Sequence, residues 1–256
     1  MLSIIINADT RGEKSQQTGL FGGVVDYDFL TDGIINKIKF FEGFEKEVIL
    51  FVDEHCKLEQ KYIDEIRSIV DCLVIRKHTS EPNFNDWNYQ TALALGRGDV
   101  IIHFDQDTAV FSPSQDSVNE LLGMLKNHKV VSYPSHWSPS AVHDDSFNYK
   151  WASTRFFMCR RDTLDLTELR RMQLDYEYYI DKYNPSRVCH WTEHLVGCLV
   201  GSDVYYPPIE LNKYAIFTWG RYEKGLLKKL NEMTYTEVVD FINSKGGIQY
   251  PNDIYA

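Results

Sequence analysis

The sequence has 256 residues, 43% hydrophobic and 25% charged, a composition typical of a globular protein with one large α/β domain or two small ones. Its formal net charge of −10 argues against sequence-independent binding of nucleic acid or anionic lipid. The 5 cysteines are odd in number and form no CxxC pair, which argues against a disulfide framework and favours a reducing, cytoplasmic location. Because no apolar run approaches the roughly 18 residues of a membrane span, we expect no transmembrane segment.

The first half of the chain alternates short apolar strands with amphipathic helices. Strands are expected at Leu2–Ile6, Glu47–Val52, Cys72–Ile75, Val100–Phe104 and Lys129–Tyr133. Between them, helices are expected at Leu30–Phe41, Leu58–Val70, Asp86–Leu95 and 117–127, whereas 10–27 has the composition of a loop. This order predicts a mostly parallel sheet with helices on both faces.

The second half of the chain is less regular. After a polar and aromatic loop at 134–149, strands are expected at Trp151–Arg160 and Asp203–Tyr206. Helical patterns cover 165–183 as one or two helices, Thr192–Val200 with Thr192 as N-cap, and 223–243. Neither an internal repeat nor a low-complexity linker interrupts the sequence, so we expect a single domain over residues 1–256.

An Asp-Gln-Asp triplet, residues 105–107, directly follows the apolar strand at Val100–Phe104. Residues two apart in an extended chain point the same way, so Asp105 and Asp107 can both face the ligand crevice at the carboxyl end of a parallel sheet. Two carboxylates there suit a hard divalent cation, and such a cation suits a diphosphate. An acidic turn that simply closes the strand is the alternative explanation.

The setting of this triplet resembles the GT-A class of nucleotide-sugar glycosyltransferases, in particular inverting family 2, over most of residues 1–210. The segment ALALGRGDVIIHFDQD matches the helix, Gly-Asp pair and metal strand of that family. The resemblance implies an α/β, Rossmann-like GT-A fold with a donor half at 1–111 and an embellished acceptor half at 112–256. It also implies a nucleoside-diphosphate sugar as donor, a UDP-sugar first among them, and a glycan or other hydroxyl compound as acceptor.

The same resemblance assigns the donor-side residues. Asp107, with Asp105, would hold Mn²⁺ or Mg²⁺, and the sequence does not choose between these metals. The end of the first strand would contact the nucleoside, Asp53 would bind the base, and Gln90 occupies a position where the family often has Asn. The donor-binding set is Ala8, Asp9, Thr10, Arg11, Asp53, Gln90, Asp105 and Gln106.

The acceptor side depends on WTEHLVGCLVGSDVYYPP at residues 191–208. In family 2 an acidic residue at the start of a short helix is the general base, and Glu193 occupies that position. A helix-terminal glutamate stabilised by the helix dipole is the alternative. The family usually has an acidic pair here, whereas this chain has Glu193 followed by His194. On the acceptor side we place His194 with Trp137, Trp151 and Trp191, although tryptophans are more often core residues.

Other interpretations stay open. The chain lacks the late histidine that completes the metal site in many GT-A enzymes. A nucleotidyltransferase that makes a nucleotide sugar is one alternative, although the glycines of TRGEKSQQTGLFGG are scattered rather than tightly clustered. A non-catalytic module that binds a sugar nucleotide or glycan is another. A nucleic-acid acceptor is less favoured by the acidic composition.

Overall fold

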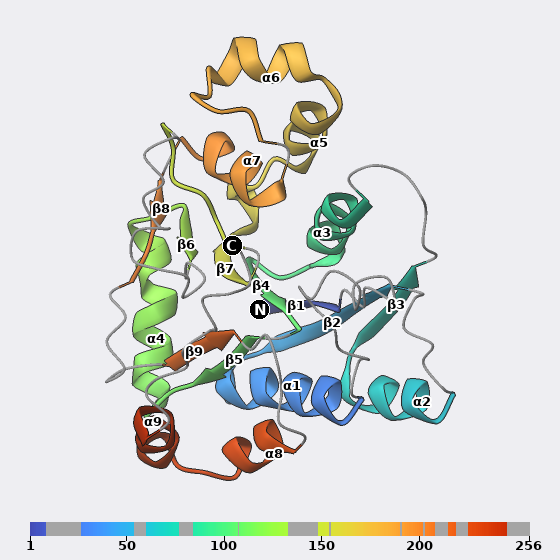
Figure 1. Cartoon of the computed structure of the whole chain (residues 1–256), viewed down its shortest axis with the longest axis vertical. Coiled ribbons are helices and arrows are strands. Elements are labelled where there is room, and N and C mark those ends of the chain that lie inside the picture. Colours follow the sequence, from blue (N-terminus) through green and yellow to red (C-terminus); the bar gives the residue numbers. More distant parts are fainter. Residues whose placement is uncertain are drawn as a thin grey trace.

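The computed structural model describes residues 1–8, 27–53, 60–76, 84–106, 108–132, 148–153, 155–189, 191–201, 203–207, 215–218 and 225–244. Its main sheet has 7 strands in the order β3-β2-β1-β4-β7-β6-β8 (Figure 1). These strands are β1 (Leu2–Ala8), β2 (Lys46–Asp53), β3 (Cys72–Arg76), β4 (Val100–Asp105), β6 (Val130–Ser132), β7 (Phe156–Arg160) and β8 (Val204–Tyr205). β1 to β4 pair in parallel, while β7 is antiparallel to both of its neighbours. The predicted α/β class with a mostly parallel sheet is therefore confirmed.

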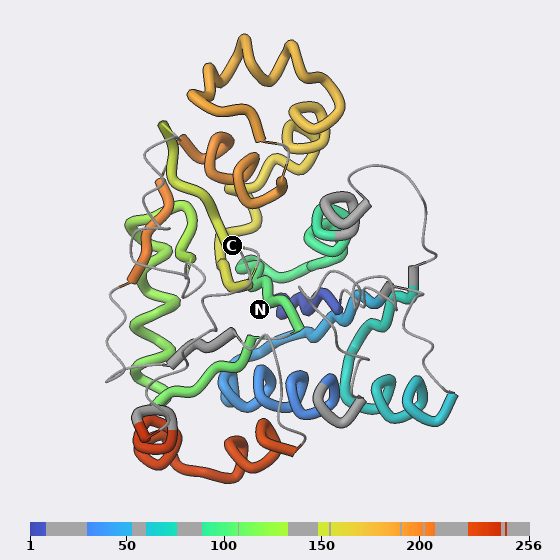
Figure 2. Tube along the Cα trace, in the orientation of Figure 1, coloured from blue at the N-terminus to red at the C-terminus, as the bar shows by residue number. Residues whose placement is uncertain are grey.

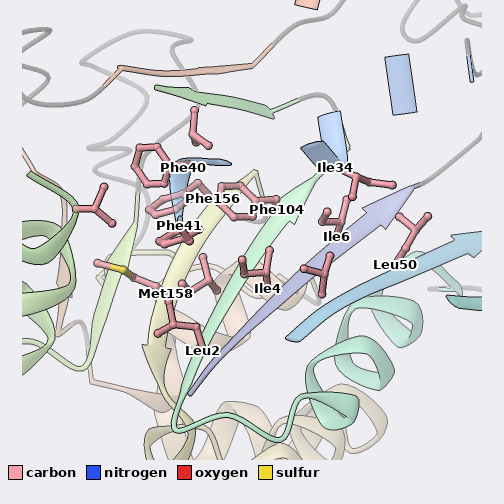
Figure 3. Packing of buried hydrophobic residues seen from close by; sticks show 14 of the residues in the cluster. Leu2, Ile4, Ile6, Ile34, Phe40, Phe41, Leu50, Phe104, Phe156 and Met158 are labelled. Atoms are coloured by element: carbon pink, nitrogen blue, oxygen red, sulfur yellow. The ribbon is translucent and has the colours of Figure 1, made fainter. Parts of the chain in front are cut away.

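Helices cover both faces of the sheet because successive strand residues point to opposite sides. On one face lie α1 (Tyr27–Phe40), α2 (Gln60–Ile69) and α4 (Gln115–Gly123) (Figure 2). On the other lie α3 (Phe84–Leu95), α5 (Leu166–Leu174) and α7 (Thr192–Leu199), and α6 (Tyr176–Tyr183) packs against α5 on the outside (Figure 2). Ile4 and Ile6 of β1 join the first core, which Figure 3 shows, and Ile5 joins the second. None of the described helices is long and apolar enough to cross a membrane.

Two short strands form a second sheet that the sequence did not predict. β5 (Thr108–Phe111) follows the triplet and pairs antiparallel with β9 (Ala215–Thr218). α8 (Leu226–Asn231) and α9 (Tyr235–Ser244) pack behind β5, and these two helices account for the helical pattern predicted at 223–243. The C-terminal part of the chain thus supports the segment just after the triplet.

Several predicted boundaries move. β7 begins at Phe156 rather than at Trp151, whereas the prediction of one or two helices at 165–183 is confirmed, with two. The prediction of Thr192 as N-cap is wrong, because Trp191 occupies that position and its side chain makes no capping bond. Thr192 is instead the first helical residue and is buried.

The connection from α3 into β4 is fixed against the start of β1 by buried hydrogen bonds. The amide of Gly98 donates to Ser3 Oγ at 2.6 Å, and Ser3 Oγ donates to Glu47 Oε1 at 2.6 Å. Burial alone would raise the pKa of Glu47, but its bonds with Ser3 and Arg97 hold that pKa below the usual value. A Cβ at Gly98 would lie 2.7 Å from the Met1 carbonyl oxygen, so this close approach requires glycine.

Candidate functional site

The candidate site lies at the carboxyl ends of β1 and β4. These parallel strands are neighbours at the centre of the sheet, and their register places Asn7 opposite Asp105. From β1 the order runs through β2 and β3 toward one edge, whereas β4 begins the other half. Ligands of open α/β sheets bind at such a switch in strand order, just beyond the carboxyl ends.

Asp105 is held in place from two directions. The hydroxyl of Tyr89, on α3, donates to Asp105 Oδ1 at 2.9 Å, and the carboxylate is half-buried. The Asp105 amide donates to the carbonyl of Arg155 at 3.3 Å. The carboxylate is therefore oriented by a second side chain, as a preorganised ligand would be.

A buried polar pair lies on the same face of the sheet as Asp105. His103 is 0% exposed, and its Nε2 lies 3.0 Å from Nδ2 of Asn7. The His103 ring stacks on Phe157 with centroids 5.3 Å apart and meets the Tyr89 ring edge at 5.1 Å. Within the described residues, Asn7 Oδ1 is buried with no hydrogen-bond partner. Since buried acceptors are normally paired, this oxygen suits a donor supplied by a ligand.

The backbone around the triplet is bonded to neighbouring segments on both sides. The Gln106 amide donates to the Asn7 carbonyl at 2.9 Å, which extends the contact between β1 and β4. Thr108 Oγ1 donates to the Arg155 carbonyl at 2.8 Å. The same carbonyl thus accepts bonds from residues on either side of Asp107, whose own placement is outside the described residues.

The other donor-side predictions fall at different places. Ala8 is buried at the end of β1, and Asp53 is the last residue of β2. Gln90 is buried on α3 and donates through Nε2 to Gln173 of α5 at 3.0 Å, so this bond joins two helices. Asp9, Thr10, Arg11 and Trp137 lie outside the described residues.

Glu193 and Asp105 are connected through one short segment. Glu193 lies in the first turn of α7, half-buried, and its carbonyl accepts a bond from the Ala152 amide at 3.0 Å. The Asp105 amide donates to the carbonyl of Arg155, which is three residues after Ala152 in the chain. Because three residues span at most about 10 Å, this segment brings the start of α7 toward the carboxyl end of β4.

Aromatic side chains surround the start of α7. Trp151 stacks on His194 with centroids 5.5 Å apart and an interplanar angle of 15°. Trp191 lies 6.0 Å from the same ring and is 61% exposed, a high value for so large an apolar side chain. The Tyr206 hydroxyl donates to the Trp151 carbonyl at 2.5 Å. Burial raises the pKa of Tyr206, and the nearby charge of Glu193 raises it further.

The oxygen ligands at the end of β4 are compatible with a hard cation that also binds substrate. Among the described residues, no three His, Cys, Asp or Glu side chains gather as a metal cluster. Mg²⁺ and similar ions are often held by only one or two carboxylates together with substrate phosphates. Asp105, at a strand end and oriented by Tyr89, has the chemistry that such a site requires.

Sequence reasoning missed four residues that build this site: Asn7, Tyr89, His103 and Arg155. Asn7 and Tyr89 carried a weak signal, since a polar residue ends an apolar strand and a tyrosine precedes Gln90 in the helix before the triplet. Arg155 acts through its backbone carbonyl, which no residue-type pattern reveals.

Neither a family model nor a curated protein sequence matches this chain. Solved structures do match. The galactosyltransferase LgtC, in complex with donor and acceptor sugar analogues, aligns with a TM-score of 0.50 at 8% identity, over 98% of both chains. A cytidylyltransferase from Leptospira borgpetersenii serovar Hardjo-bovis aligns with a TM-score of 0.52 at 12% identity, also over 98% of both chains.

The glycosyltransferase GlyE of Streptococcus pneumoniae TIGR4 aligns with a TM-score of 0.48 at 10% identity. The alignment covers 98% of this chain, and this chain spans 65% of the length of GlyE. At such low identities, the likeness to LgtC and to the cytidylyltransferase shows a shared α/β fold and no more.

Proposed function

We propose that the chain is a metal-dependent glycosyltransferase that moves a sugar from a nucleoside-diphosphate sugar to an acceptor hydroxyl. One observation carries the proposal: Asp105 ends the central strand opposite Asn7, where the strand order switches, and Tyr89 orients its carboxylate. The resemblance of the triplet to the family 2 metal motif and the fold shared with LgtC support it.

On the donor side, Asp105 and Asp107 are the proposed ligands of Mg²⁺ or Mn²⁺. A bound cation would stabilise the negative charge that develops on the leaving diphosphate. The residues that end β1 and β2 are the proposed nucleoside contacts: Ala8, Asp9, Thr10, Arg11 and Asp53. Asn7 Oδ1, buried and without a described partner, would accept a hydrogen bond from a ribose hydroxyl or a base N–H. Gln90 and Gln106 complete the proposed donor side.

On the acceptor side, Glu193 is the proposed general base. It would take the proton from the acceptor hydroxyl as that oxygen forms a bond to the anomeric carbon. The bond from that carbon to the diphosphate breaks on the opposite side, which inverts the configuration and releases the nucleoside diphosphate. The exposed ring of Trp191 would stack on the apolar face of an acceptor sugar, beside Trp151 and His194.

A screen of nucleotide sugars with Mn²⁺ by thermal shift tests the donor half, because a ligand that binds the folded state raises stability with its concentration. We expect at least one nucleoside-diphosphate sugar to raise the melting temperature only in the presence of metal. Asp105→Ala and Asp107→Ala should lose this shift, whereas Asp240→Ala, at an exposed position on α9, should keep it. Equal shifts in all three variants would contradict the proposal.

A nucleotidyltransferase is the second candidate because a cytidylyltransferase shares the fold. The two reactions differ in the bond that breaks. A glycosyltransferase releases nucleoside diphosphate from a nucleotide sugar, whereas a nucleotidyltransferase releases pyrophosphate from a nucleoside triphosphate. Analysis of the products by anion-exchange chromatography therefore distinguishes them, and pyrophosphate as the product would replace our proposal with the second candidate.

A further inference from the structure

The side chain of Lys37, a residue of α1, is fully buried against the backbone that follows the triplet. Lys37 is 0% exposed, and its ammonium group donates to the Thr108 carbonyl at 2.6 Å and to the Gly33 carbonyl at 3.2 Å. The Lys37 ammonium lies 5.4 Å from the centroid of the Phe104 ring. Removing an ammonium group from water is costly, so its position calls for a physical explanation.

The helix approaches the triplet closely at this point. A Cβ at Gly33 would lie 3.5 Å from the Gln106 carbonyl oxygen and 3.7 Å from Lys37 Nζ. The lysine ammonium is thus located where α1 passes beneath residues 106 and 108. Bonds from an ammonium group to carbonyl oxygens are charge-assisted and stronger than bonds between neutral groups.

The residue next to Lys37 extends the same contact. Asn36 accepts a bond from the Val110 amide at 2.7 Å and donates to the Val110 carbonyl at 3.0 Å. Lys37 and Asn36 therefore bind alternate residues, Thr108 and Val110, of the short strand β5. The other edge of β5 pairs with β9. Side chains of α1 thus take the place of a neighbouring strand and fix the backbone that leaves the triplet.

We infer that Lys37 is a positioning residue that holds the triplet backbone in the geometry needed to bind a metal–nucleoside diphosphate complex. The inference rests on the proposed function, since it concerns the same site. It adds Lys37 of α1, whose side chain contacts the backbone next to the triplet rather than the ligand. A purely structural lysine would contribute to stability alone, so the two roles differ in their effect on ligand affinity.

Lys37→Met removes the charge and the donors but keeps the length of the side chain. We expect it to weaken binding of Mn²⁺ with UDP by about tenfold or more, the effect of losing a bond to a charged group. Lys46→Met is the matched control, because Lys46 also donates to two carbonyls, those of Phe41 and Phe44. Lys46 pairs with Leu2 at the opposite end of the strands, so this variant should bind normally.

Isothermal titration calorimetry with Mn²⁺ and UDP separates the outcomes. If the wild type binds and a folded Lys37→Met binds equally well, the role of Lys37 is wrong while the proposed function survives. If the wild type fails to bind this complex and every other nucleoside diphosphate with Mn²⁺, the proposed donor site is wrong and the Lys37 role with it.

A measurement on the wild-type protein covers the case in which Lys37→Met does not fold. The ε-methylene signal of Lys37 should be recognisable by NMR from its proximity to the Phe104 ring. Saturation with Mg²⁺ and UDP should shift this signal and leave that of Lys46 in place. An unchanged Lys37 signal at saturation would overturn the inference.

Discussion

The hydroxyl of Tyr89 donates to Oδ1 of Asp105 at 2.9 Å and so connects α3 to the end of the central strand β4. This bond occupies one oxygen of the carboxylate and sets the direction of the group. A metal ligand held by a second residue binds more tightly than one that must be ordered on binding. The bond therefore links the packing of a helix to the affinity of the proposed site.

Tyr89→Phe should keep the ring and its contact with His103 but lose the bond to Asp105. We expect binding of Mn²⁺ with a nucleoside diphosphate to weaken by about tenfold, since a hydrogen bond to a charged group is lost. Calorimetric titration measures the change. Tyr205→Phe, on the edge strand β8 and three strands away from β4, is the control. Unchanged affinity in Tyr89→Phe would show that Asp105 needs no help from this hydroxyl.

Gly197 is required by the contact between α7 and the segment before β7. A Cβ at this position would overlap the Lys150 carbonyl oxygen, where backbone rather than a flexible side chain must move. Gly197→Ala should destabilise the fold by about 1–3 kcal/mol or more. It should also reduce turnover, because Glu193 is on the displaced helix.

The control for Gly197→Ala is Gly123→Ala at the end of α4. Apart from its own helix, no described residue has an atom within 4 Å of a Cβ at Gly123, and its φ of −61° is helical. This change should leave stability unaltered or raise it by about 0.5–1 kcal/mol through the better helix propensity of alanine. Urea unfolding of the two variants provides the test, and equal effects would show that space at residue 197 is not limiting.

The elements that follow directly from a local sequence pattern were the most predictable. Two apolar runs form central strands, at Leu2–Ile6 and Val100–Phe104. Because their apolar side chains point to both sides, such strands are stable only when both faces of the sheet are covered. By contrast, β5 and β9 are four-residue strands about a hundred residues apart in sequence, and each becomes a strand only by pairing with the other. The antiparallel position of β7 between β4 and β6 likewise depends on long-range strand pairing rather than on local sequence.

The candidate site shows the same division. Asp105 and Glu193 were predicted as site residues from their positions after a strand and at a helix start. The groups that bond to them depend on which segments meet in space: the Tyr89 hydroxyl and the Arg155 carbonyl for Asp105, and the Ala152 amide for Glu193. Thr192 had the residue type of an N-cap, yet it is buried within the first helical turn, so burial outweighed local preference.

Glu168 joins α5 to α6 by accepting hydrogen bonds from Lys182, Tyr178 and Tyr183. Burial, the largest single influence, would raise the pKa of Glu168, but these three bonds together lower it to about 2. A carboxyl group with a folded-state pKa below its unfolded value stabilises the protein above the unfolded pKa. Its contribution should therefore be complete above about pH 4.5 and be lost as the pH falls toward 2.

Glu168→Gln tests this pH dependence. The difference in unfolding free energy between wild type and variant should be constant near neutral pH and should shrink below about pH 4.5. Denaturant unfolding at several pH values gives this difference. Glu177→Gln removes the same charge from α6 outside the cluster, so it corrects for the change in net charge. A difference that does not vary with pH would exclude Glu168 as the source of acid sensitivity.

Glu193→Gln bears most directly on the proposed reaction. The amide keeps the size of the side chain but is not a general base, and such a base contributes about 10²–10⁴-fold to rate. We therefore expect kcat to fall by that order while binding of donor and metal is retained, because Glu193 belongs to the acceptor side. Steady-state release of nucleoside diphosphate measures kcat, calorimetry measures donor binding, and Glu42→Gln at an exposed surface position is the control.

Since α7 approaches Asp105 through the segment that contains Ala152 and Arg155, a loss of donor binding would instead indicate disruption of that segment. Full turnover with intact donor binding would remove Glu193 from the mechanism and leave the acceptor hydroxyl to another base.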